Sequence, residues 1–195
     1  MTAFYRFGRG LCRLALLPWR VRALGIERVP TTGPLIVAAN HVSYLDPPVL
    51  GIFLPRMLHY MAKRELFAVP GLGAAIAAVG AFPVVRGGNP LSAIRRSVEV
   101  LREGKAVAIF PEGRRNTDGL APIQSGVSLL ASLARAPVVP ACIVGPDRAR
   151  RFARITVVYG EPLRDACENG LARGDIEPFA QRVMAAIRAL RAEAA

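Results

Sequence analysis

The sequence has few of the residues that bind metals or form disulfides. Its 195 residues include two histidines and three cysteines, and Cys12, Cys142 and Cys167 lie far apart in the chain. Structural zinc sites use closely spaced cysteine and histidine pairs, and small disulfide-stabilised domains use an even set of cysteines. We therefore expect no bound metal, no cofactor and no disulfide framework, with the three thiols reduced.

Acidic and aromatic residues are also scarce. The chain has 14 acidic residues against 26 basic ones, a net charge of +12, and only 7% of its residues are aromatic. An excess of positive charge attracts polyanions such as anionic lipids, phosphorylated substrates or nucleic acid. Single-strand binders interleave basic and aromatic residues, and no stretch here does so. We therefore expect an anionic membrane surface or a phosphorylated ligand, and no nucleic acid.

The longest stretch without a charged residue is residues 66–85. Pro70 and Pro83 limit a helix there to residues 71–82, about 12 residues, which is too short to cross a bilayer. A helix of that length is common in a protein core, so a buried helix is favoured over a transmembrane span. A cleavable signal peptide is not expected either, because arginines interrupt the N-terminal region.

The N-terminal segment has two chemically different sides. On a helical wheel of residues 4–20, four arginines fall on one side and five large apolar residues on the other: Arg6, Arg9, Arg13 and Arg20, against Phe4, Phe7, Leu11, Leu14 and Trp19. Helices that lie in a membrane interface have this pattern. We therefore predict a membrane-associating amphipathic segment at 1–22 and a single further domain at 23–195. The alternative is a terminal helix that docks on its own domain and leaves its arginines solvated.

Short apolar runs alternate with helical patterns along the rest of the chain. We expect strands at 34–40, 82–86, 106–113, 136–145 and 154–162, and helices starting at Asp46, at 71–82, at 91–104 and from about residue 175. Asp46 would cap its helix, with proline at the first helical position. This alternation predicts an α/β fold, with a largely parallel mixed sheet flanked by helices.

Charged residues follow three of the predicted strands. His41 follows the first, Arg86 the second, and Glu112 and Arg115 the third. Parallel strands bring their carboxyl ends to one edge, where ligands bind. His41 can act as a general base if it lies in the loop and Asp46 begins the next helix. The guanidinium groups of Arg86 and Arg115 are suited to bind phosphate.

Each of these residues also has a simpler structural interpretation. Asp46 would then only cap its helix, His41 would only bond the loop, and the arginines would be solvated surface charges. Ser43 lies between His41 and Asp46, but it lacks the glycine-flanked turn of a serine nucleophile. We interpret Ser43 as a loop hydroxyl and His59, in an apolar stretch, as structural.

Four blocks, taken in order, resemble the glycerolipid acyltransferase family. They are NHVSYLD at 40–46, GAFPVVRG at 80–87, FPEGRRNTDG at 110–119 and VVPACIVG at 138–145. The resemblance spans roughly residues 20–165. It implies an enzyme that moves a fatty acyl group from acyl-CoA or acyl carrier protein to the sn-2 hydroxyl of 1-acylglycerol-3-phosphate, a lysophospholipid, and so forms phosphatidic acid. It also implies a peripheral or monotopic protein on the cytoplasmic face of the membrane.

The resemblance also implies a role for each matching residue. His41 would be the general base and Asp46 would orient it, with no covalent acyl-enzyme and no metal. The glycerol phosphate would be held by Arg86, Glu112, Gly113 and Arg115. The accessory residues would be Asn40, Arg114 and Pro140, and Pro140 would shape the wall of the acyl-chain site.

The third block departs from the family pattern. Arg114 stands in place of the usual threonine and Asn116 in place of serine, and Gln124 and Ser125 stand where many relatives have a lysine. These changes leave other acceptors open: glycerol 3-phosphate, another lysophospholipid or a lipid alcohol. A non-catalytic module that binds anionic lipids is the remaining alternative.

Overall fold

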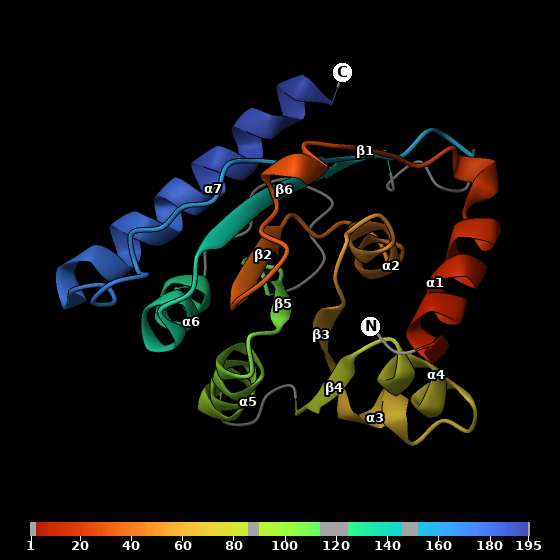
Figure 1. Ribbon diagram of the computed structural model, residues 1–195, viewed down its shortest axis with the longest axis horizontal. Coiled ribbons are helices and arrows are strands. Elements are labelled where there is room, and N and C mark those ends of the chain that lie inside the picture. Colours follow the sequence, from red (N-terminus) through yellow and green to blue (C-terminus); the bar gives the residue numbers. More distant parts are fainter. Residues whose placement is uncertain (1–2, 86–89, 114–124, 146–151, 195) are drawn as a thin grey trace.

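The computed structural model describes residues 3–85, 90–113, 125–145 and 152–194. Within these ranges seven strands form one sheet in the order β1-β7-β6-β2-β5-β3-β4 (Figure 1). The strands are β1 (Arg22–Leu24), β2 (Leu35–Ala39), β3 (Leu58–Lys63), β4 (Ala81–Val84), β5 (Ala106–Ile109), β6 (Val138–Val144) and β7 (Thr156–Tyr159). β1 and β3 lie outside the strands expected from the sequence.

All neighbouring strands are parallel except β6 and β7, which pair antiparallel. The largely parallel mixed sheet is thus confirmed. β2 lies near the centre, with Ala38 opposite Ile109 of β5 and opposite Pro140 of β6. All five of its residues are buried, which explains its continuous apolar sequence, because helices cover both faces of a central parallel strand.

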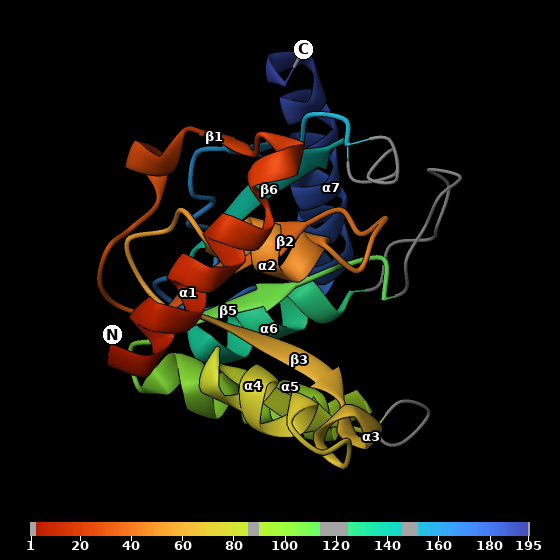
Figure 2. The same cartoon turned by 90° about the vertical axis from the view of Figure 1, so that its right-hand side faces the viewer.

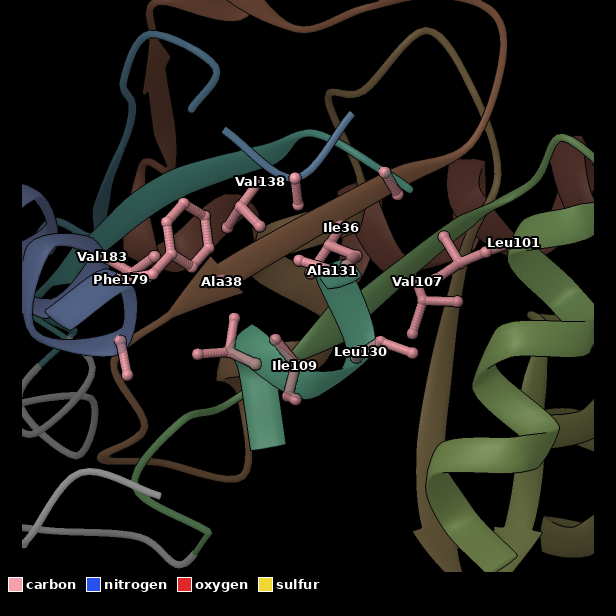
Figure 3. Packing of buried hydrophobic residues seen from close by; sticks show 14 of the residues in the cluster. Ile36, Ala38, Leu101, Val107, Ile109, Leu130, Ala131, Val138, Phe179 and Val183 are labelled. Carbon is pink, nitrogen blue, oxygen red and sulfur yellow. The ribbon is translucent and has the colours of Figure 1, made fainter. Parts of the chain in front are cut away.

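Helices pack on both sides of the sheet. One face is covered by α5 (Pro90–Arg102), α6 (Gly126–Ala134) and α7 (Ile176–Glu193), and the other by α2 (Asp46–Gly51) and the region around α1 (Ala3–Ala15). Figure 3 shows the first of these two cores, where Phe179 and Val183 of α7 and Leu130 of α6 lie against Ile36 and Ala38. Short 3-10 turns occur at Leu17–Trp19, Ile26–Arg28 and Arg173–Asp175.

The uncharged stretch at 66–85 differs from the prediction. It contains the end of α3 (Arg64–Phe67), α4 (Leu72–Ala78) and strand β4, and the only buried residue of α4 is Gly73. The prediction of a buried core helix was therefore wrong, because the chain turns into β4 after one short helix that lies on the surface. None of the helices that the structure describes has the length and hydropathy needed to cross a membrane.

The N-terminal helix α1 packs on the domain and is bonded to it by two of its arginines. The Arg9 guanidinium donates to the Leu54 carbonyl at 2.8 Å, and Arg13 Nε donates to the Ile52 carbonyl at 3.0 Å. The side that packs on the domain carries the buried Tyr5, whereas Phe7 on the apolar side is 71% exposed. The helix thus docks on its own domain, with Arg6 and Arg13 exposed and Arg9 partly buried. It ends at Ala15, before Pro18.

Candidate active site

His41 and Asp46 form the closest pair of ionisable side chains at the carboxyl end of β2. His41 Nδ1 lies 2.8 Å from Asp46 Oδ2. Asp46 is fully buried, while the His41 side chain keeps 12% of its surface exposed. A carboxylate can only accept, so the His41 Nδ1–H donates, and the lone pair of the ring lies on Nε2. An imidazole in this tautomer is suited to take a proton from a bound group.

The backbone of the intervening loop holds the same carboxylate oxygen. Val42 N–H donates to Asp46 Oδ2 at 2.6 Å, and Ser43 N–H donates to it at 2.7 Å. Asp46 is the first residue of α2 and Leu45 is the N-cap, with proline in the first turn. The prediction that Asp46 caps its own helix was therefore wrong, since its carboxylate bonds the loop before the helix. This loop brings together two residues that a continuous helix would separate.

The far end of α2 is anchored to the sheet. The Tyr159 hydroxyl, on β7, donates to the Leu50 carbonyl at 2.6 Å. Burial raises the pKa of Tyr159 far above its usual range, so the hydroxyl stays protonated and remains a donor. A Cβ on Gly51 would lie 2.2 Å from the Tyr60 hydroxyl, so only glycine allows α2 to pack this closely on β3. A short helix that is held at both ends keeps Asp46 in place.

Asn40 joins the end of β2 to β6. Its Nδ2 donates to the Ile143 carbonyl at 2.9 Å, and its Oδ1 accepts from Ile143 N–H at 2.7 Å. This pair of bonds continues the β2–β6 ladder with a side chain in place of backbone. Because Asn40 immediately precedes His41, the contact fixes where the loop of His41 leaves the sheet.

The third sequence block lies next to the histidine. Phe110, directly after β5, stacks on the His41 ring with centroids 4.3 Å apart and planes at 23°. Gly113 N–H donates to the Phe110 carbonyl at 2.9 Å and closes a turn that contains the buried Glu112. Gly113 has φ +67°, a conformation that glycine adopts readily. The first and third blocks therefore meet, as the strand-end argument predicted.

Of the other described candidates, Pro140 lies away from this cluster, and the Ser43 side chain bonds its own loop. Pro140 lies within β6 opposite Ala38, on the side of the sheet that packs against α7, whereas α2 packs on the other side. Ser43 Oγ accepts from Leu45 N–H at 3.2 Å, as a loop hydroxyl does. The predictions for Arg86, Arg114, Arg115, Asn116 and Gln124 fall outside the residues that the structure describes.

His59 has a structural position. Its Nδ1 lies 3.1 Å from the Ala106 carbonyl on the neighbouring strand β5, and burial lowers its pKa below the ordinary value of 6.5. The three cysteines are free thiols, and burial raises the pKa of Cys142 to about 11. A thiol with so high a pKa is a poor nucleophile at neutral pH.

Sequence reasoning did not identify three residues that support the site: Phe110, Tyr159 and Ile143. Phe110 was visible as an aromatic residue at a strand end inside the third block. The other two are far from His41 in sequence, and only the pairing of β6 and β7 with the rest of the sheet brings them near.

Comparison with known proteins agrees with this geometry. The acyltransferase family model matches residues 20–144. The chain is 32% identical over 167 residues to the 1-acyl-sn-glycerol-3-phosphate acyltransferase of Bacillus subtilis, covering 83% of each chain. It is 26% identical over 200 residues to the enzyme of that name from Streptococcus pneumoniae, covering 97% of this chain and 74% of the other.

A solved structure shares the fold. The crystal structure of the 1-acyl-sn-glycerophosphate (LPA) acyltransferase PlsC from Thermotoga maritima matches with a TM-score of 0.77 at 22% identity, over 96% of this chain and 78% of that one. The family match spans more than half of the chain and includes the histidine–aspartate loop, the Phe110 turn and the β6 block. The resemblance seen in the four sequence blocks is thus confirmed, and the chain belongs to the acyltransferase family.

Proposed function

We propose that this chain transfers a fatty acyl group from an acyl thioester to the sn-2 hydroxyl of 1-acylglycerol-3-phosphate and so makes phosphatidic acid. The observation that carries the proposal is the His41–Asp46 contact, with Nδ1 bonded to a buried carboxylate and Nε2 left to accept a proton. The relatives from Bacillus subtilis and Streptococcus pneumoniae, named for this reaction, support the choice of acceptor.

The chemistry needs one proton to move twice. His41 Nε2 takes the proton of the acceptor hydroxyl as the oxygen attacks the thioester carbonyl. Asp46 stabilises the imidazolium that forms, through the 2.8 Å contact. The tetrahedral intermediate then collapses, the carbon–sulfur bond breaks, and the imidazolium returns the proton to the departing sulfur. An ester and a free thiol result, without an acyl-enzyme.

The third block supplies the binding site for the acceptor in this proposal. Glu112 and Gly113 lie on the turn that follows Phe110, next to the His41 ring. Arg86 and Arg115, from the second and third blocks, are the phosphate ligands, because guanidinium groups bond phosphate with two parallel donors. Arg114, next to Arg115 in the sequence, adds a further positive charge.

The N-terminal helix is the membrane-associating element of the proposal. Arg9 and Arg13 bond it to the domain, and its outer side exposes Phe4, Phe7, Leu11 and Leu14. Monomeric proteins rarely expose several large apolar side chains together unless another surface covers them. An anionic bilayer fits this side, because the chain carries a net charge of +12.

Thiol release and phosphatidate formation test the reaction together. Purified wild type, His41→Ala and Arg115→Ala are incubated with palmitoyl-CoA and lysophosphatidate in liposomes, and lipid products are resolved by mass spectrometry. Phosphatidate that disappears in His41→Ala supports the proposal. Thiol release without phosphatidate instead points to another acceptor, such as glycerol 3-phosphate, a different lysophospholipid or a lipid alcohol.

The donor is tested in the same assay, with acyl carrier protein replacing CoA. If neither donor releases thiol with any acceptor, while vesicle binding survives His41→Ala, then the chain is a non-catalytic lipid-binding module and the proposed reaction is wrong.

A further inference from the structure

A second apolar surface lies beside the N-terminal helix. It is formed by α3, α4 and the residues between them, and we call residues 64–78 the α3–α4 segment. Its large apolar residues are well exposed: Leu66 by 39%, Val69 by 46% and Leu72 by 42%. Small apolar residues of the same segment are exposed as well, at positions 68, 70, 71, 74, 75 and 77. A segment with this composition and this exposure is unusual on a soluble surface.

The α3–α4 segment lies next to the outer side of α1. The two elements are in contact, and a Cβ on Gly8 would lie 3.4 Å from a methyl group of Val79, just after α4. Figures 1 and 2 show α1, α4 and α3 along the same side of the molecule, the side that faces the viewer in Figure 2. The apolar residues of the two elements therefore border one side of the protein.

The same segment also lies at the edge of the sheet that carries the active site. α3 begins at Arg64, directly where β3 ends, and β3 pairs parallel with β5, which pairs parallel with β2. His41 follows β2 and Phe110 follows β5, so α3 shares their edge (Figure 2). A surface that covers α3 would thus reach the edge where a lipid acceptor enters.

We infer that the α3–α4 segment is a second membrane-contacting element, which inserts its apolar residues into the outer part of a lipid monolayer beside α1. This inference rests on the proposed function, because it identifies how the same site meets its lipid substrate. The segment is too short to span, so its position is interfacial.

Charge and chemistry both favour lipid as the occupant of this surface. Lys63, Arg64 and Glu65, all exposed, precede the apolar residues and together carry one net positive charge, and residues 66–85 carry no charge. Basic residues beside an apolar patch match anionic headgroups above acyl chains. The acceptor and product of the proposed reaction also carry acyl chains, so they reside in a bilayer. A second copy of the chain would instead hide the outer side of α1 from that bilayer.

Vesicle binding by matched leucine variants tests the inference. Leu72→Ser and the double variant Val69→Ser/Leu72→Ser are compared with Leu133→Ser, which alters a leucine of similar exposure, 51%, on α6 across the sheet. Binding to phosphatidylcholine–phosphatidylglycerol vesicles is measured by co-sedimentation. We expect a loss of about tenfold for Leu72→Ser, from lost apolar contact, a larger loss for the double variant, and none for Leu133→Ser.

A second measurement does not depend on loss of binding. Tryptophan is introduced by Leu72→Trp and, as the control, by Leu133→Trp, and its fluorescence is followed in vesicles with brominated acyl chains. Insertion of the α3–α4 segment predicts quenching beyond wild type for Leu72→Trp only. If binding falls without this quenching, the loss comes from misfolding and the inference is wrong.

The outcomes separate this inference from the proposed function. If Phe7→Asp on α1 abolishes vesicle binding while Val69→Ser/Leu72→Ser binds like Leu133→Ser, α1 alone holds the membrane and the inference fails. If the double variant turns a dimer into a monomer in light scattering and still binds vesicles, the occupant is a second copy and the inference also fails. Phosphatidate formation by the wild type is measured separately. It tests the proposed reaction independently of the vesicle-binding results.

Discussion

Replacing Asp46 by asparagine tests the proposed mechanism most directly, because the amide has nearly the same shape as the carboxylate and no charge. In the wild type, one oxygen of Asp46 accepts from His41, Val42 and Ser43 at 2.6–2.8 Å. In Asp46→Asn an amide oxygen in the place of Oδ2 keeps all three donors, and the NH2 group takes the place of Oδ1. His41 therefore keeps its proton on Nδ1 and its lone pair on Nε2, and the variant removes only the charge that stabilises the imidazolium.

The loss in rate follows from the charge of the carboxylate. A unit positive charge on imidazole about 4 Å from a unit negative charge gains about 4 kcal/mol at an effective dielectric constant of about 20. This energy is absent while His41 is neutral and appears as the imidazolium forms, so it lowers the barrier. Its loss slows kcat by about 10³-fold. That value lies within the range of about 10²–10⁴ expected for a general base.

The assay is single-turnover phosphatidate formation with saturating lysophosphatidate, for wild type, Asp46→Asn, His41→Ala and the double variant. We expect the two single variants to slow phosphatidate formation by similar factors. The double variant should be only slightly slower, because the two residues act as one unit. Ser43→Ala is the control, since its hydroxyl only accepts a loop N–H. An Asp46→Asn enzyme that melts normally and keeps kcat within about threefold of wild type would refute the reasoning.

Three further predictions concern the framework of the site. Burial lowers the pKa of His59 in the folded protein, so the unfolded chain binds a proton on this residue more readily. Wild type should therefore lose stability as pH falls below about 6.5. In melting curves, His59→Gln should make the stability depend less steeply on pH in that range. Arg13→Ala removes a 3.0 Å bond to the Ile52 carbonyl and should cost about 1–2 kcal/mol in urea unfolding. Gly51→Ala places a Cβ against the Tyr60 hydroxyl and should cost about 1–3 kcal/mol by the same method.

The sequence allowed the fold class and the centre of the site to be predicted, because both depend on local patterns. Apolar runs such as 34–40 identified buried strands, and the polar residues after them marked one edge of the sheet. The five-residue spacing of His41 and Asp46 was interpreted correctly as a loop followed by a helix start. These inferences need only strand direction and the position of two prolines.

Other features depend on contacts between distant segments, and sequence patterns do not encode those. The Tyr159 hydroxyl reaches Leu50 across 109 positions, and Asn40 reaches Ile143 across 103. The segment at 66–85 shows a different limitation. Its composition suits a core helix and a membrane-facing surface equally well, because both environments are apolar. Only the positions of α1 and β4 reveal that α4 lies outside the core.

Two arginines of α1 link this helix to the end of α2. A short helix such as α2 leaves carbonyl groups unpaired at its C-terminal end, and here the following carbonyls, at Ile52 and Leu54, accept from Arg13 and Arg9. Guanidinium groups bind such carbonyls well, because they are charged donors near the negative end of a helix. The wheel pattern alone could not distinguish arginines facing headgroups from arginines facing the domain. Since α2 begins with Asp46, the helix that exposes Phe7 and Leu11 is the same one that holds the far end of the helix carrying the Asp46 carboxylate.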